Sequence, residues 1–159
     1  MRTNLASDTR PALDAQHPVA VRRAVTSLAA RLRSERAGSL TLNETAVLGR
    51  LATRGAMTAG EVARHLRSKP QSLTRTFAAL EKAGFVHRSS AHADRRHALL
   101  EVTEAGLQAL AVEMAPRDAW LGAAMQRMLT TEESEVLAVA ARLLQRLADA
   151  DPDLEGSAP

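Results

Sequence analysis

Hydrophobic residues recur every three or four positions through most of the chain, a spacing that predicts amphipathic helices rather than strands. The first stripe predicts a helix over about residues 18–36 that ends near Gly38, and its apolar positions are Val21, Val25, Leu28 and Leu32. The last stripe predicts a helix over residues 131–147, and its apolar positions are Val136, Leu137, Ala140, Leu143, Leu144 and Leu147. The chain is therefore expected to begin and end with amphipathic helices.

Four segments carry the capping-box pattern of a helix start, in which a hydroxyl residue is followed three positions later by Glu or Gln. They are Thr41 to Glu44, Thr58 to Glu61, Ser68 to Gln71 and Thr130 to Glu133. The first three boxes predict helices that end before Gly55, near Leu66 and near Ala83. Gly84 can supply the left-handed residue that commonly follows a helix.

The spacing of the hydrophobic residues changes after Gly84. Residues 85–88 and 99–103 predict two short strands, joined by a polar, basic loop that is too long for a tight turn. A long helix is predicted from Glu104, and Pro116 lies inside it. Because proline lacks a backbone N–H, we expect this helix to kink or break near Ala115.

These elements predict a mostly α protein, with a helix-turn-helix followed by a two-stranded β-hairpin. We expect flexible tails at residues 1–16 and 150–159, and one domain over residues 17–149. The helix-turn-helix and the hairpin would lie within residues 41–106, and residues 17–37 and 107–148 would form dimerisation helices. A 66-residue centre cannot cover the apolar stripes of the outer helices. The candidate dimer contacts are Val21, Val25, Leu28, Leu137, Leu143, Leu144 and Leu147.

Composition narrows the function classes. The 159-residue chain has no cysteine, which excludes disulfides, thiolate chemistry and Cys-based zinc fingers. Only 2% of its residues are aromatic, so a base-stacking platform for single-stranded nucleic acid is not expected. The sequence shows no apolar run of the ~20 residues that a membrane span needs and no signal-peptide pattern, so we expect a cytoplasmic protein without a membrane partner.

Positive charge is concentrated in the middle of the chain. Nine basic and three acidic residues lie between Arg54 and His97, a net charge of +6. The rest of the chain, with twelve basic and fifteen acidic residues, carries −3. A basic centre between acidic flanks is typical of a protein that binds nucleic acid.

The second helix of the predicted helix-turn-helix has the side chains of a recognition helix, which enters the DNA major groove by its N-terminal end. Gln can bond an adenine edge, Arg can grip a guanine, and hydroxyls and Lys suit phosphates. The candidate DNA contacts are Ser68, Lys69, Pro70, Gln71, Ser72, Thr74 and Arg75, with Thr58 as a candidate contact to the DNA backbone.

The hairpin loop adds a second basic element. Its candidate DNA contacts are Arg88, Asp94, Arg95 and Arg96. Arginines at a hairpin tip can lie over the minor groove, where the negative potential attracts them. Asp94 would orient an arginine, because a carboxylate facing a phosphate would be repelled.

Thr41 to Gly106 resembles the winged helix-turn-helix of MarR-type (multiple antibiotic resistance regulator) transcriptional regulators. The resemblance rests on the segments Leu80–Val86, Asp94–Arg96 and Leu99–Gly106. The Asp-x-Arg of the family wing falls on Asp94 and Arg96, and the family's Leu-Thr-x-x-Gly falls on Val102–Gly106, with Val in place of Leu.

The resemblance implies a homodimer, bound to an inverted-repeat operator in double-stranded DNA, that represses a nearby or divergent gene. A small-molecule effector of unknown identity would release it, and no cofactor or metal is expected. Trp120, Met114, Met57 or Leu48 could line an effector pocket, although apolar residues at helical spacing usually belong to a core.

Three alternatives stay open. Five histidines, together with Glu101, Glu104 and Glu113, could serve a metal-responsive regulator, although no tight His-x-His or His-x-x-x-His pair is present. An enzyme is disfavoured because no phosphate loop, nucleophile elbow or nucleophile–base pattern occurs. An architectural DNA-binding module without an effector would bind mixed DNA nearly as well as its own site.

Overall fold

The computed structural model describes residues 14, 16–35, 38–89 and 98–150. They form two compact units, of which the first ends at Glu35 and the second takes in the described residues from Gly38 on. The expected N-terminal tail, apart from Asp14 and Gln16, lies outside the described residues. So does the expected C-terminal tail, apart from Ala150.

The first unit consists of α1, Gln16–Ser34, which begins two residues earlier than the stripe predicts. The reason is Asp14, whose carboxylate accepts a hydrogen bond from the backbone N–H of Gln16 at 3.0 Å and whose carbonyl accepts one from His17. Asp is a favourable residue at this position because it satisfies donors that the first turn leaves free. No residue of α1 is buried.

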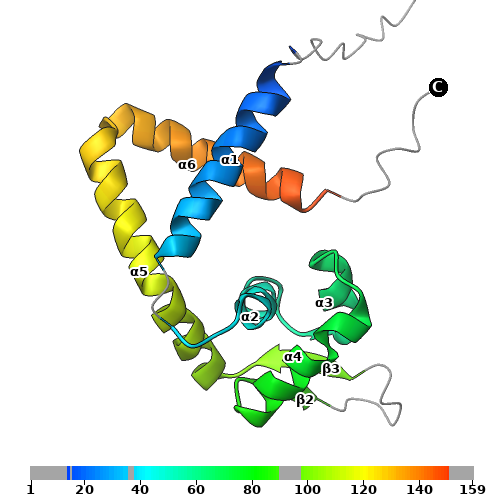
Figure 1. The fold of residues 1–159 in the computed structure, drawn as a ribbon. Coiled ribbons are helices and arrows are strands. Elements are labelled where there is room, and N and C mark those ends of the chain that lie inside the picture. Colours follow the sequence, from blue (N-terminus) through cyan, green and yellow to red (C-terminus); the bar gives the residue numbers. More distant parts are fainter. Residues whose placement is uncertain (1–13, 15, 36–37, 90–97, 151–159) are drawn as a thin grey trace, which may run out of the picture. The chain divides into compact units, whose positions relative to one another are not determined.

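The second unit holds the remaining elements (Figure 1). They are α2 (Leu42–Arg54), β1 (Met57–Thr58), α3 (Ala59–His65), α4 (Pro70–Lys82), β2 (Val86–Ser89), β3 (Leu99–Val102), α5 (Glu104–Met128) and α6 (Thr131–Ala148). The capping boxes at Thr41, Thr58 and Thr130 are confirmed, each with both of its hydrogen bonds. Helices α2, α3 and α6 therefore start where the sequence predicts.

The sheet has three antiparallel strands in the order β1-β3-β2. The predicted hairpin is present: Val86 pairs with Val102 and Ser89 pairs with Leu99. In addition, Met57 of β1 pairs with Leu100. With only two residues, β1 is too short for an alternating pattern, so the sequence did not reveal it.

One hydrophobic core lies among α2, α3, α4 and the sheet. Its buried residues are Leu40, Val47, Leu48, Leu51, Met57, Val62, Ala63, Leu73, Phe77, Leu80, Val86 and Leu100. Helices α2, α3 and α4 each supply residues to this core. The exposed sides of the same helices are therefore fixed as well.

Helix α5 passes through Pro116 without ending, so the helix does not break at Ala115. The missing proline N–H removes one backbone hydrogen bond. Across this turn the guanidinium of Arg117 lies 2.9 Å from the carboxylate of Glu113, which is 1% exposed. This buried pair joins the two sides of the proline.

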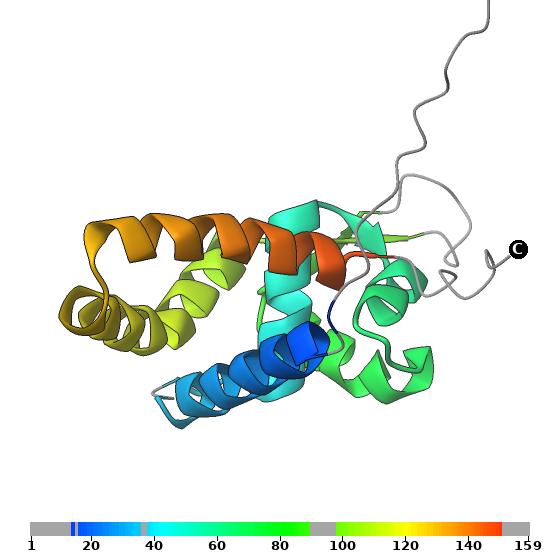
Figure 2. The ribbon, with the colours of Figure 1, turned by 90° about the horizontal axis from the view of Figure 1, so that it is seen from above.

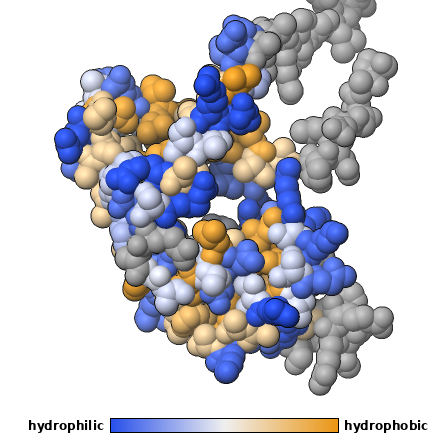
Figure 3. All heavy atoms as spheres, viewed as in Figure 1, coloured by the Kyte–Doolittle hydropathy of each residue, from blue (hydrophilic) through white to orange (hydrophobic). Residues whose placement is uncertain are grey.

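Helix α5 leads away from the sheet, and α6 returns toward α2 and α3 (Figure 1 and Figure 2). No residue of α6 is buried. Hydrophobic side chains lie at the surface near the junction of α5 and α6 (Figure 3). Among the described helices, none is both long and apolar enough to cross a membrane.

Candidate nucleic-acid interface

The recognition helix predicted from the sequence is α4, and its two faces differ sharply. Leu73, Phe77 and Leu80 are at most 3% exposed and hold the helix against the core. The side chains of Gln71, Ser72, Thr74 and Arg75 are exposed. The core contacts therefore turn the predicted base-reading residues toward solvent.

The predicted capping box at Ser68 is wrong. The N-cap of α4 is Lys69, no side chain caps the helix, and Pro70 occupies its first turn. The Ser68 hydroxyl instead donates to the carbonyl of Leu66 at 3.2 Å. Proline favours the first helical position because its φ is already helical, which places the helix start one residue later than the box requires.

The turn between α3 and α4 is a Schellman motif. The N–H of Ser68 donates to the carbonyl of Ala63, and the N–H of Arg67 donates to that of Arg64. Arg67 has a φ of +49°, a left-handed conformation that usually selects glycine. The motif escaped prediction because an arginine stands at the glycine position.

Thr58 begins α3, and its side chain is engaged within the protein. Its hydroxyl accepts from the N–H of Glu61 at 3.2 Å and lies 2.8 Å from the Glu61 carboxylate. The pKa of Glu61 lies below its ordinary value, first because the backbone N–H of Thr58 donates to the carboxylate and second because the hydroxyl does. The capping box therefore already engages the Thr58 hydroxyl, the group proposed to contact the DNA backbone.

The base of the wing is joined to the recognition helix. Arg88 of β2 is a candidate DNA contact, and its Nε donates to the carboxylate of Glu81 on α4. Beside it, His87 Nε2 lies 3.3 Å from Glu101 Oε2 across the strand pair. The candidate wing residues Asp94, Arg95 and Arg96 lie outside the described residues.

The candidate dimer contacts lie on surfaces rather than in the core. In α1, Val21, Val25 and Leu28 are 40–45% exposed. In α6, Leu137, Leu143 and Leu147 are 37–67% exposed, and Leu144 is half-buried. The predicted apolar stripes of both helices are therefore uncovered within a single chain.

The residues considered for an effector pocket or a metal have other surroundings. Leu48 and Met57 are core residues, whereas Met114 and Trp120 are half-buried. Glu113 pairs with Arg117. Within residues 14, 16–35, 38–89 and 98–150, no three His, Asp or Glu side chains are grouped so that they could hold a metal ion.

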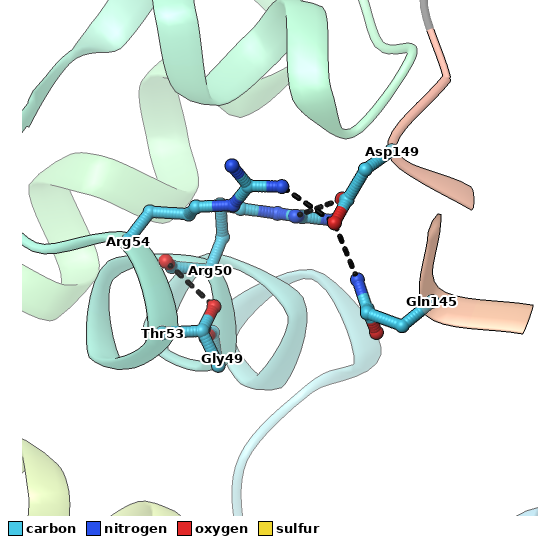
Figure 4. Close-up of polar contacts among 6 residues, drawn as sticks. All are labelled: Gly49, Arg50, Thr53, Arg54, Gln145 and Asp149. Carbon is cyan, nitrogen blue, oxygen red and sulfur yellow. Dashed lines mark hydrogen bonds and ion pairs between the residues drawn. The ribbon is translucent and has the colours of Figure 1, made fainter. Parts of the chain in front are cut away.

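An ion-pair cluster that no sequence pattern predicts joins α2 to the end of α6 (Figure 4). Asp149 lies 3.3 Å from Arg50 Nη1 and 2.6 Å from Arg54 Nη2. We call these three residues the arginine–aspartate cluster. Asp149 lies about a hundred positions after the two arginines in the chain, so only the fold could bring the three together.

Comparisons with known proteins agree with this architecture. The model of the MarR family matches residues 40–98. An HTH-type transcriptional regulator from Mycobacterium tuberculosis is 36% identical over 132 residues, which cover 81% of this chain and 90% of that protein.

Two solved structures extend the comparison. A transcriptional regulator from Pseudomonas aeruginosa has 33% identity and a TM-score of 0.66, covering 86% of this chain and 96% of its own. BpsR from Bordetella bronchiseptica, whose DNA binding is regulated by 6-hydroxynicotinic acid, has 23% identity and a TM-score of 0.58, covering 82% of this chain and 98% of its own.

The fold and the exposed face of α4 define a winged helix-turn-helix DNA-binding protein. The chain belongs to the MarR family of transcriptional regulators. The relative from Mycobacterium tuberculosis is likewise a transcriptional regulator. The resemblance stated from the sequence is confirmed.

Proposed function

We propose that the protein is a homodimeric repressor that binds an inverted-repeat operator and is released by a small-molecule effector. One observation carries the proposal: α4 buries Leu73 and Phe77 while Gln71 and Arg75 are exposed on the same helix. The start of α4 has no side-chain cap, so its backbone donors suit a DNA phosphate.

The uncovered stripes of α1 and α6 support the homodimer. A second copy that covers Val25, Leu143 and Leu147 would remove apolar surface from water, which favours association. A twofold dimer presents two recognition helices about one DNA turn apart, ~34 Å, which requires an inverted repeat. We keep residues 17–149 as the proposed functional domain, with residues 41–106 as its DNA-binding part.

Release by an effector is supported by family membership and by the control of BpsR by 6-hydroxynicotinic acid. A ligand that favours a dimer with the wrong helix separation would lower operator affinity.

Selection of bound duplexes from a random pool tests the DNA proposal. We expect enrichment of an inverted repeat, bound at least about a thousandfold more tightly than mixed DNA. Enrichment without any shared sequence would instead identify an architectural protein.

The selected duplex then tests Arg75 as a base contact. Arg75→Ala should weaken its binding by about 1–3 kcal/mol while binding of mixed DNA changes little. Lys82→Ala, which removes a positive charge from the other end of α4, is the matched control. Equal losses on both duplexes would make Arg75 a phosphate contact. Arg96→Ala should also loosen binding, and an unchanged affinity would mean that the wing stays off the duplex.

A further inference from the structure

The ion pair between Glu81 and Arg88 joins the recognition helix to the strand that leads into the wing. Glu81 lies in the last turn of α4, and Arg88 lies in β2. The Glu81 carboxylate accepts a hydrogen bond from Nε of Arg88. Within the described residues the Arg88 guanidinium makes no other hydrogen bond or ion pair, so its two amino groups are available to a further acceptor.

The pair lies between α4 and the hairpin, on the side of both that candidate DNA contacts share. Arg88 pairs with Leu100 in the sheet, and because side chains alternate along a strand, Arg88 shares the sheet face of the buried Val86 and Leu100. On α4, Glu81 follows Thr74 by two helical turns, so these two residues lie along one edge of the helix. Glu81 therefore stands between two of the residues expected to meet DNA, Thr74 and Arg88.

A glutamate is unfavourable at this place for two reasons. The last turn of α4 is the negative end of the helix dipole, which disfavours an acid. In addition, a carboxylate close to DNA phosphates is repelled by them. A residue that conflicts with its surroundings often serves another purpose. Charge alone would favour a neutral side chain in place of Glu81.

The stability of the fold does not account for this glutamate. The side chains of Arg88 and Glu81 are 42% and 32% exposed, and ion pairs at the surface contribute little to folding. Backbone hydrogen bonds already fix the hairpin to α4: the N–H of Phe85 donates to the Leu80 carbonyl at 2.9 Å, and the N–H of Thr103 donates to the Phe85 carbonyl at 3.0 Å. What Glu81 adds is a fixed direction for the Arg88 side chain.

We propose that Glu81 is a positioning residue for DNA binding, whose carboxylate holds Nε of Arg88 so that the two amino groups meet a phosphate of the DNA backbone. The proposal rests on the proposed function. An arginine that is ordered before DNA arrives loses less side-chain entropy on binding, which amounts to roughly threefold to tenfold in affinity. A phosphate contact carries no sequence information, so the gain applies to any duplex.

Fluorescence anisotropy with the selected duplex and with mixed DNA tests the role of Glu81. Glu81→Ala removes the acceptor together with a negative charge, so charge alone predicts tighter binding. We expect the opposite, a loss of about threefold to tenfold on both duplexes. Glu81→Gln keeps an oxygen acceptor at the same place and should recover most of the loss. Stronger or unchanged binding by Glu81→Ala would overturn the proposal.

The matched control is Glu101→Ala. Glu101 is an exposed acid of the same hairpin, and it pairs with His87 on the sheet face opposite Arg88. Its removal takes away the same charge without freeing an arginine, so binding of both duplexes should be unchanged or stronger. A loss equal to that of Glu81→Ala would show that any acid of the hairpin region has this effect, and the proposal would fail.

A double-mutant cycle separates positioning from a general structural role. Arg88→Ala should weaken binding of both duplexes and reduce the steepness of the salt dependence by about 0.9, the value for one phosphate contact. In the Arg88→Ala background, Glu81→Ala should cause no further loss, because no side chain is left to position. Equal losses in the two backgrounds would show that Glu81 acts without Arg88, which would overturn the proposal.

Arg88→Lys leaves α4 unchanged and tests the arrangement even if Glu81→Ala does not fold. Lysine keeps the charge but lacks the planar fork that Glu81 holds, so it should bind both duplexes about threefold to tenfold more weakly. Full affinity of Arg88→Lys would overturn the proposal. A selection that enriches no inverted repeat would refute the proposed function, and the measurements on mixed DNA would still decide the role of Glu81. Binding of neither duplex would overturn both.

Discussion

Two glycines of α5 show how much a single missing side chain can matter. At Gly106, a Cβ would overlap the carbonyl oxygen of Phe85 and come within 2.9 Å of Val102 Cγ2. At Gly122, a Cβ would meet nothing within 4 Å. The first glycine is therefore required where α5 leaves the sheet, whereas the second only weakens its helix.

Gly106→Ala should lower the free energy of unfolding by about 1–3 kcal/mol, because the backbone must shift to admit the methyl group. Gly122→Ala is the matched control, and it should raise the free energy by about 0.5–1 kcal/mol through its better helix propensity. Urea unfolding measures both. Similar effects of the two substitutions would contradict the close approach of α5 to Phe85.

The burial of the pair formed by Glu113 and Arg117 could not be predicted from the sequence. A glutamate and an arginine four positions apart on a helix are usually read as a solvated surface pair. Here the Glu113 side chain is 1% exposed, and a Cβ on Gly38 would overlap its carboxylate. The burial depends on a loop that arrives from about 75 positions earlier, which no local pattern reveals.

At the scale of elements, the capping-box pattern predicted three helix starts correctly. Its one failure, at Ser68, has a local cause. The three threonine boxes each form both of their hydrogen bonds. At Ser68 the following Pro70 moves the helix start, and the Ser68 hydroxyl turns to Leu66. Gly84, with a φ of +73°, ends α4 as predicted, whereas Arg67 adopts the same region without a glycine to announce it.

The capping box of α3 gives a prediction with a defined pH dependence. Thr58→Ala should lower the free energy of unfolding by about 1 kcal/mol at neutral pH, and Thr58→Ser should recover most of it. Because the folded-state pKa of Glu61 is depressed, its contribution is present above the pKa of the unfolded chain. It is lost as the pH falls through the lower, folded value.

Chemical denaturation between pH 7 and pH 3 measures this contribution. Glu61→Gln should reduce the loss of stability on acidification, whereas Glu135→Gln, an acid outside any capping box, should leave the acid profile as it is. An acid profile that Glu61→Gln does not alter would show that the carboxylate contributes nothing beyond the hydroxyl cap.

At the scale of the whole molecule, basic residues and exposed apolar residues lie on different elements. The basic residues gather in the winged helix-turn-helix, while the outer helices leave leucines and valines exposed. The sequence predicted this division because both stripes and charge runs are local patterns. It could not predict the arginine–aspartate cluster, which forms only when α6 returns to α2.

The exposed apolar stripe of α6 leads to a prediction about dimer formation. Leu143→Asp puts a charge in the middle of the stripe, and burying it against a second copy would cost far more than the apolar contact gains. Ala138→Asp puts the same charge on an exposed position away from the stripe. Sedimentation should find the unmodified protein and Ala138→Asp at twice 17.0 kDa, and Leu143→Asp at the single-chain mass.

Loss of the dimer should carry over to DNA. A monomer engages one half-site at a time, so Leu143→Asp should bind the inverted repeat about a hundredfold more weakly, whereas its affinity for an isolated half-site should stay the same. The half-site measurement separates lost assembly from a damaged recognition helix. If Leu143→Asp remained dimeric, the dimer would have to use a surface other than the stripe of α6, and the inverted-repeat geometry would need another origin.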